Sequence, residues 1–214
     1  KSPIQGISET LNIDYRTPKT LKDNHEEYEF LKELNADLAI VCAYGQIIPE
    51  NFLNLTKKGF VNIHASILPS WRGAAPIQRS IMNLDPETGI SIMKIKKELD
   101  SGPVSNIYKI KIDQNQNAQE ISEKLSALAA EKILDNVDDI LEDKAKFIDQ
   151  DHSKATYAKK IDKEESRIDW DEDASKIIGK INGLFPSPGA SFSFNGERYK
   201  ILKAEIGNGI GQVG

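Results

Sequence analysis

Cysteine is nearly absent from this sequence, since Cys42 is the one cysteine among 214 residues. A single cysteine excludes a disulfide within the chain, and disulfides are the usual support of small secreted domains. Cys42 lies in the apolar run of residues 38–43, where we expect an inert, buried thiol. The sequence also lacks an apolar run long enough to cross a bilayer, and its first residues show no secretory core. We therefore expect a cytoplasmic protein.

A surplus of positive charge is lacking as well. The chain holds 33 acidic residues against 28 Lys and Arg, for a net charge of −5. A general nucleic-acid binder usually carries a basic surplus, so this class is disfavoured, although a local basic face is compatible with these totals. The three histidines, His25, His64 and His152, show no spacing typical of a metal site, and we expect no metal.

The sequence has no initiating methionine, and it ends on a glycine-rich stretch, residues 205–214, with no closing element. We expect both ends to be cuts. The chain also begins with a helix signal, whereas a doubly wound α/β sheet begins with a strand. We therefore expect the first strand of the fold to lie upstream of Lys1.

Strand and helix signals alternate along the first 149 residues, which predicts an open, mostly parallel α/β sheet with crossover connections. Residues 90–95 and 104–112 are expected to pair as a hairpin. Strands are expected at residues 13–15, 37–43, 60–64, 90–95 and 104–112, and helices at residues 3–11, 24–34, 51–58, 76–82 and 118–141.

The character of the chain changes at Gln150, where apolar residues become sparse and charged residues dominate. We expect a catalytic domain over residues 1–149, truncated at its start, and a linker over residues 150–172. A small β-rich domain then begins over residues 173–214 and is not completed. A helix is expected at residues 174–184, and Asn195-Gly196 predicts a hairpin between residues 191–194 and 198–202.

The densest set of candidate functional residues lies between Asn62 and Arg79. Asn62 and His64 alternate on a predicted strand, so both side chains project to one face near its carboxyl end, where α/β sheets place ligands. An amide and an imidazole side by side can hold an oxyanion and move a proton. The alternative is a structural pair, a satisfied core histidine and a turn asparagine.

Asp100 lies in a predicted loop between two strands, within Leu99-Asp-Ser-Gly102. A carboxylate at that point can reach across the sheet end and orient a histidine. Alone it is an ordinary turn aspartate, and spacing does not show whether it meets His64.

Three segments together resemble the signature of the folate-dependent formyltransferases. They are Asn62-Ile-His64, then Ser66-Ile-Leu-Pro69, then Arg72-Gly-Ala-Ala-Pro-Ile-Gln-Arg79. Thr88-Gly-Ile90 and the Asp100 loop fall where the family has similar stretches. The resemblance runs over nearly the whole chain and implies a Rossmann-like formyltransferase domain. The motif is specific for the superfamily and says little about the amine that accepts the formyl group.

Other segments indicate the acceptor. Residues 73–80, 156–159, 167–170 and 186–189 resemble the branch of the family that acts on aminoacyl-tRNA. The last three look like its linker and the opening of its C-terminal, OB-like β-barrel. Two positions depart from that branch, which usually has tryptophan where this chain has Ser187 and a basic residue near Asn182.

The resemblance implies transfer of a formyl group from 10-formyltetrahydrofolate to the α-amine of initiator methionyl-tRNA. Asn62 would bind the oxyanion of the tetrahedral intermediate. His64, kept cationic by Asp100, would stabilise or protonate the same oxygen, and Asp100 would accept the proton released by the amine. We expect a monomer whose partners are folate and this tRNA.

The implied binding residues form two groups. The folate would lie against Ala43, Tyr44, Gly45, Ile47, Ile48, Ser66, Ile67, Leu68 and Pro69. The tRNA would contact Arg72, Arg79, Lys159 and Lys160, with Lys154 and Lys163 nearby.

Two alternatives stay open at this point. One is a formyltransferase that acts on another amine, such as a nucleotide-linked amino sugar. The other is a folate-binding module without catalysis. A nicotinamide-dependent dehydrogenase is disfavoured because these residues contain no glycine-rich dinucleotide turn.

Overall fold

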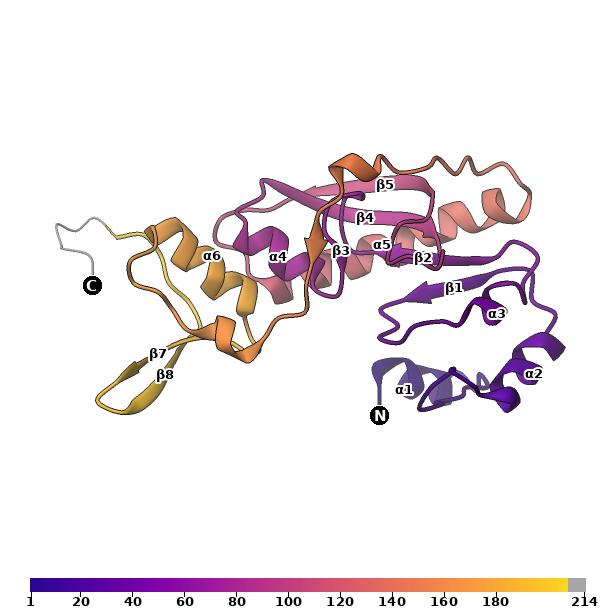
Figure 1. Ribbon diagram of the computed structural model, residues 1–214, viewed down its shortest axis with the longest axis horizontal. Helices are drawn as coiled ribbons and strands as arrows, with labels where there is room; N and C mark the ends of the chain where they lie inside the picture. Colours follow the sequence, from indigo (N-terminus) through magenta and orange to yellow (C-terminus); the bar gives the residue numbers. More distant parts are fainter. Residues whose placement is uncertain (208–214) are drawn as a thin grey trace.

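Four strands form the main sheet, in the order β1-β2-β4-β5 (Figure 1). The computed structural model describes residues 1–207. The strands are β1 (Ala39–Cys42), β2 (Phe60–His64), β4 (Glu87–Lys94) and β5 (Val104–Lys111). The 24-residue helix α5 (Ala118–Leu141) lies along this sheet in Figure 1. Strands and helices of one layered unit confirm the predicted α/β class.

The strand directions follow from the connections. β1 and β2 are parallel, and helix α3 (Glu50–Leu53) lies in the crossover between them. β2 pairs with β4, and β4 with β5, in antiparallel fashion. The β4–β5 connection is a short hairpin, as predicted, which is possible only for antiparallel neighbours. Among residues 1–207, β1–β2 is the parallel pair of this four-stranded sheet.

Capping residues set the helix starts. Ser2 accepts from the Gln5 N–H at 3.1 Å and begins α1 (Pro3–Thr10), and Asn24 begins α2 (His25–Glu33) in the same way. Asn117 and Glu120 form a reciprocal capping box before α5. Helices α4 (Pro76–Met82) and α6 (Ala174–Leu184) have the predicted bounds.

Residues 13–15 and helix α3 differ most from the prediction, and β4 begins three residues before its predicted start at residue 90. Residues 13–15 form no strand, and the side chain of Ile13 is 56% exposed. Tyr15 bonds back to Glu9 instead, at 2.8 Å. Helix α3 ends at Leu53, before the predicted end at residue 58, because the chain there makes other bonds. The Lys58 N–H donates to the Asp37 carbonyl at 2.7 Å, on the segment leading into β1.

The prediction of a buried Cys42 is wrong, because the thiol is exposed. Over residues 1–207, β1 is an edge strand that pairs with β2 alone. Its side chains alternate between partly covered and exposed positions, and Ile40 is 48% exposed. A continuous apolar run predicts a strand covered on both faces, whereas the side chains on one face of β1 are exposed among these residues.

The core lies between the sheet and α5. Ile121 and Leu125 of the helix pack with Ile90 of β4, while Ile140 packs with Val61 and Ile92. The predicted inward stripe of α5 is confirmed at its buried positions. Leu128, Ile133 and Val137 of that stripe are partly covered.

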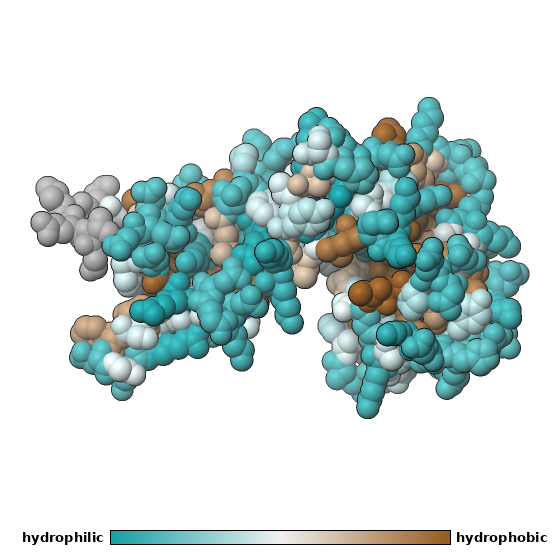
Figure 2. Space-filling model, in the orientation of Figure 1, coloured by the Kyte–Doolittle hydropathy of each residue, from teal (hydrophilic) through white to brown (hydrophobic). Residues whose placement is uncertain are grey.

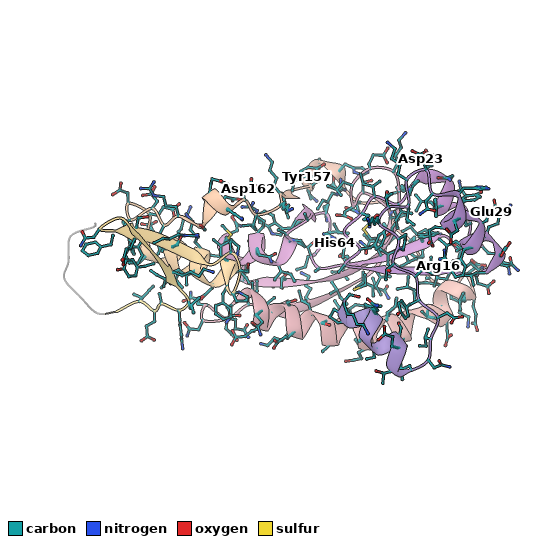
Figure 3. All side chains as sticks on the ribbon, turned by 90° about the horizontal axis from the view of Figure 1, so that it is seen from below. Arg16, Asp23, Glu29, His64, Tyr157 and Asp162 are labelled. Carbon is teal, nitrogen blue, oxygen red and sulfur yellow. The ribbon has the colours of Figure 1, made fainter. Side chains whose placement is uncertain are left out.

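Residues after α5 cross back over the sheet end before the second part of the chain begins. That stretch contains the 3₁₀ helix η1 (His152–Lys154), strand β6 (Tyr157–Ala158) and the 3₁₀ helix η2 (Lys163–Ser166). Strand β6 pairs in parallel with β3 (Arg72–Gly73). Figure 3 shows the stretch from below, with Tyr157 in β6 and Asp162 before η2. The segment expected to be a linker therefore contributes a strand beside the predicted site.

Helix α6 packs against α4 and buries Ile181 and Leu184. Strands β7 (Ala190–Phe194) and β8 (Glu197–Ile201) form the predicted hairpin. Its turn residues, Asn195 and Gly196, have φ angles of 49° and 79°, the left-handed pair that a two-residue turn requires. In the described part of the chain, no helix combines the length and apolarity needed to span a bilayer.

Candidate active site

Strand β2 presents Asn62 and His64 on one face at its carboxyl end, as predicted. His64 is 5% exposed, whereas Asn62 is half-buried. No side-chain hydrogen bond joins the Asn62 amide to another of residues 1–207.

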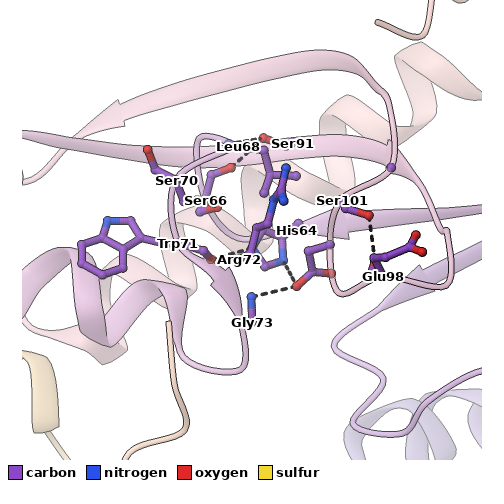
Figure 4. Close-up of polar contacts among 12 residues, drawn as sticks. His64, Ser66, Leu68, Ser70, Trp71, Arg72, Gly73, Ser91, Glu98 and Ser101 are labelled. Atoms are coloured by element: carbon purple, nitrogen blue, oxygen red, sulfur yellow. Dashed lines mark hydrogen bonds and ion pairs between the residues drawn. The ribbon is translucent and has the colours of Figure 1, made fainter. Parts of the chain in front are cut away.

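Both ring nitrogens of His64 face acceptors (Figure 4). Nε2 lies 2.9 Å from the Trp71 carbonyl oxygen, and Nδ1 lies 3.6 Å from Oδ2 of Asp100. A carbonyl only accepts, so Nε2 carries a hydrogen and donates. Nδ1 is therefore the nitrogen that remains for a proton shared with Asp100 or for a substrate atom.

Asp100 meets His64, which spacing alone did not show. Its Oδ2 accepts a hydrogen bond from the Gly73 N–H at 2.8 Å, and the side chain is 16% exposed. The residue has a φ of 45°, a left-handed conformation that aspartate tolerates better than most residues. The loop thus turns one carboxylate oxygen toward both the histidine and the backbone of β3.

A set of hydroxyl bonds shapes the segment predicted to bind folate. Ser91 of β4 donates to the Ser66 carbonyl at 2.7 Å and accepts from the Leu68 N–H at 3.1 Å. Ser66 donates to the Ser70 carbonyl at 2.6 Å. Ser91 lies opposite His64 in the β2–β4 register, so its bonds hold this segment next to the end of β2. Sequence reasoning missed Ser91, because nothing distinguishes it in a strand pattern.

Side-chain burial divides the folate candidates. The side chains of Ser66 and Leu68 are buried and do not face solvent, while those of Ile67 and Pro69 are partly exposed.

In the loop after β1, Ile47 is 89% exposed and Tyr44 is 40% exposed. Burial of part of the ring, with Glu27 nearby, raises the pKa of Tyr44. Figure 2 shows hydrophobic surface where β1 ends in Figure 1. Apolar side chains thus reach solvent beside the predicted site.

Arg72 is almost completely buried, which corrects its prediction as a tRNA contact. It is 3% exposed, and its Nε and Nη2 donate to Oε1 of Gln150 at 3.1 and 2.7 Å. Nη2 also lies 3.1 Å from Nδ1 of His152. A buried guanidinium cannot reach a phosphate, and motif position gave no sign of this burial.

Arg79 contacts the stretch that follows β6. It forms two hydrogen bonds with Glu165 and donates to the Lys159 and Lys160 carbonyls. The Glu165 carboxylate raises the pKa of Arg79, and Arg79 in turn lowers the pKa of Glu165. The side chains of Lys159 and Lys160 are exposed.

Trp71, whose orientation the sequence left open, is half-buried. Its Nε1 donates to Oδ2 of Asp85 at 2.7 Å, and its backbone N–H donates to Oγ1 of Thr156 at 2.8 Å. Trp71 has a left-handed φ of 60°, and its carbonyl oxygen lies 2.9 Å from Nε2 of His64. The contribution of Trp71 to the site is therefore its backbone oxygen, which residue type does not predict.

The site holds an amide, an imidazole and a carboxylate at one sheet end, with a backbone N–H fixing the carboxylate. This set can stabilise negative charge on an oxygen and transfer a proton. Among residues 1–207, no three His, Cys, Asp or Glu side chains gather as a metal ligand set would.

Comparison with known proteins shows which family this sequence matches. Residues 3–137 match the formyl transferase family, and residues 160–214 match the formyl transferase C-terminal domain. Methionyl-tRNA formyltransferase of Pelagibacter ubique is 66% identical over all 214 residues, which span 69% of that protein. Methionyl-tRNA formyltransferase of Dictyoglomus turgidum is 44% identical over 96% of this chain and 65% of its own length.

Solved structures share the fold at lower identity. WlaRD, a sugar 3N-formyl transferase solved with dTDP and 5-N-formyl-THF, superposes with a TM-score of 0.76 at 20% identity, over 98% of this chain and 71% of its own. HypX from Aquifex aeolicus, solved with tetrahydrofolic acid, gives 0.71 at 20% identity, over 84% of this chain and 31% of its own. Sequence match, relatives and fold agree, and this chain belongs to the formyl transferase family.

Proposed function

We propose that this chain transfers a formyl group from 10-formyltetrahydrofolate to the α-amine of methionine on initiator tRNA, for the initiation of translation. The observation that carries the proposal is the 66% identity, over the whole chain, to a methionyl-tRNA formyltransferase. The grouping of Asn62, His64 and Asp100 at one sheet end supports it. The chain spans about two thirds of the length of its first relatives, so the proposal concerns the protein that contains it.

The reaction begins when the amine nitrogen attacks the formyl carbon. A tetrahedral intermediate forms, and its oxygen carries the negative charge. The bond between the formyl carbon and N10 of the folate then breaks. The proton lost by the amine ends on N10, so the products are formyl-methionyl-tRNA and tetrahydrofolate. The chemistry needs oxyanion donors and one proton carrier and uses no metal ion.

The three residues divide these tasks. The Asn62 amide, which has no partner among the described residues, donates to the oxyanion. Nδ1 of His64, once protonated, is the second donor, because Nε2 is engaged by the Trp71 carbonyl. Asp100 faces that nitrogen at 3.6 Å and receives the proton of the amine, directly or through a water molecule.

The folate is proposed to lie between the loop of residues 43–48 and the segment of residues 66–69. Ile47 and Ile67 offer apolar surface to the ring system, and backbone groups read its edge. Ser91 fixes the backbone of the second segment through Ser66 and Leu68.

The acceptor tRNA is proposed to contact Lys159 and Lys160, which are exposed cations beside β6. Arg79 contributes by fixing the carbonyls of that segment. We further propose the division into a catalytic domain (1–149), a linker (150–172) and the start of a barrel (173–214). The protein would act as a cytoplasmic monomer.

The test is formyl transfer from 10-formyltetrahydrofolate by the complete protein that contains this chain and by its His64→Ala variant. Methionyl initiator tRNA and a nucleotide-linked amino sugar are offered separately. We expect transfer to the tRNA and a loss of at least ~100-fold in the variant. His25→Ala, an exposed histidine on α2, is the matched control and should keep full activity.

Transfer to the sugar alone would replace the acceptor and keep the chemistry, an outcome with the fold of WlaRD as precedent. Absence of transfer to both, with folate still bound, would support a non-catalytic folate-binding module. Equal rates for the wild type and His64→Ala would remove His64 from the mechanism.

A further inference from the structure

Gln150 belongs to none of the motifs, yet its amide is fully used at the site. The residue is 8% exposed. Its Nε2 donates to the Asp100 carbonyl at 2.9 Å and to the Gly102 carbonyl at 2.7 Å. Its Oε1 accepts both bonds from Arg72. One side chain thus joins the Asp100 loop to the residue before Gly73.

These contacts bear on the position of the Asp100 carboxylate. Its Oδ2 lies between the Gly73 N–H and Nδ1 of His64. Gln150 binds the Asp100 loop through the Asp100 carbonyl, and it binds strand β3 through the side chain of Arg72. Asp100 also has a left-handed φ, so its backbone needs outside contacts to stay in place.

The backbone around Gln150 is fixed on both sides. Val104 and Ile148 exchange two hydrogen bonds, at 2.8 and 2.9 Å, just before it. The Arg72 N–H donates to the Thr156 carbonyl at 2.8 Å, just after it. The Gln150 amide therefore has little freedom to move away from the loop.

We propose that Gln150 is a positioning residue for formyl transfer, which holds Asp100 at its distance from His64 by bonding the loop backbone and Arg72 together. The inference rests on the proposed function, because the reaction it serves is that one. Gln150 touches neither substrate nor folate in this role and acts through Asp100.

The test compares two substitutions. Gln150→Met keeps the size of the side chain and removes every hydrogen bond. Gln150→Glu keeps the acceptor for Arg72 and, when ionised, removes both donors to the loop carbonyls. The matched controls are Gln114→Met and Gln114→Glu, at an exposed position in the turn before α5.

We expect kcat to fall about 10- to 100-fold in both Gln150 variants, with little change in the KM for methionyl-tRNA, because misplacement of the reacting groups affects the chemical step. The pH profile of kcat should change in shape, since the His64–Asp100 pair shapes it. The Gln114 variants should match the wild type in both respects.

A second measurement is independent of activity. The NMR signals of the His64 ring, assigned by their loss in His64→Ala, should shift in the Gln150 variants and stay in place in the Gln114 variants. If the wild type transfers no formyl group, the proposed function fails. The NMR signals of the His64 ring still show whether Gln150 positions the residues around it.

Folded Gln150 variants with wild-type kcat and unshifted His64 signals would overturn the inference. So would a loss of folding in both variants, seen by circular dichroism, since it would leave Gln150 with a purely structural role.

Discussion

The guanidinium of Arg79 and the carboxylate of Glu165 meet through two hydrogen bonds, Nη1 to Oε2 at 2.6 Å and Nη2 to Oε1 at 2.9 Å. The residues are 86 positions apart, one on α4 and the other in η2. Their side chains are only 17% and 32% exposed. A paired, partly shielded contact of this kind stabilises more than an exposed ion pair.

Because of this contact, the free energy of unfolding depends on pH. Arg79 depresses the pKa of Glu165 in the folded chain, whereas an unfolded glutamate has a pKa of about 4.3. The unfolded chain therefore takes up the proton first. The stabilisation is complete above that pH and is lost as pH falls through the lower folded value.

We therefore expect Glu165→Gln to lower the free energy of unfolding by about 1–2 kcal/mol at pH 7. The difference from the wild type should shrink in denaturant melts taken below about pH 4. Glu164→Gln, at an exposed neighbour, is the control and should change little. A Glu165→Gln penalty that stays constant from pH 7 to pH 3 would contradict the argument.

Asp100→Asn removes the negative charge of the side chain and keeps its size, so it tests the charge alone. Asparagine tolerates the left-handed φ and keeps an oxygen for the Gly73 N–H, so the melting temperature should stay close to the wild-type value. Loss of the carboxylate should reduce formyl transfer by about 100-fold or more, as for removal of a proton acceptor. Asp113→Asn, before α5, is the exposed control. A variant with full activity would exclude Asp100 as the proton acceptor.

Gly102 adjoins β4 too closely for any side chain. A Cβ atom there would lie 1.8 Å from the Lys94 carbonyl oxygen. We expect Gly102→Ala to lower the free energy of unfolding by about 2–4 kcal/mol and to displace the Asp100 loop.

Gly6→Ala in α1 is the control substitution, since a Cβ there meets nothing within 4 Å. It should stabilise by about 0.5–1 kcal/mol. Similar effects of the two substitutions would contradict the packing argument.

Lys159 and Lys160 test the tRNA surface. If both contact phosphates, the double alanine variant should weaken binding of methionyl-tRNA and lower the slope of log K against log salt concentration by about 1–2. Lys124→Ala, exposed on α5, should leave the slope unchanged. Single-turnover rates at saturating tRNA should stay near wild type, because neither lysine lies at the reacting atoms. An unchanged slope would place the tRNA contacts elsewhere.

Local signals predicted most of the fold. A proline begins α4, an apolar stripe marks α5, and Asn195-Gly196 forms its turn, because each depends on residues close together in the sequence. The same reasoning gave the face shared by Asn62 and His64. It failed for Cys42, whose exposure depends on what covers β1 and not on the apolar run that contains it.

The rest of the site depends on contacts between distant positions. The partner of Arg72 is Gln150, 78 residues away, and no local pattern links an arginine to one glutamine among several. Burial follows from that pairing, so the motif suggested an exposed cation where the fold has an internal one. The carbonyl of Trp71 is beyond prediction for another reason, since every residue has a carbonyl and only the fold aims this one at His64.

The bond between Gln150 and the Asp100 carbonyl spans 50 residues of chain. During synthesis the loop therefore emerges well before the residue that secures it. At about 5–20 residues per second, the ribosome needs roughly 3–10 s to cover that interval. During this time Asn62, His64 and Asp100 have already been synthesised, while residues 148–158, which hold the loop in the folded chain, have not. The Asp100 loop can thus reach its braced position only after the ribosome has made α5 and the residues up to Gln150.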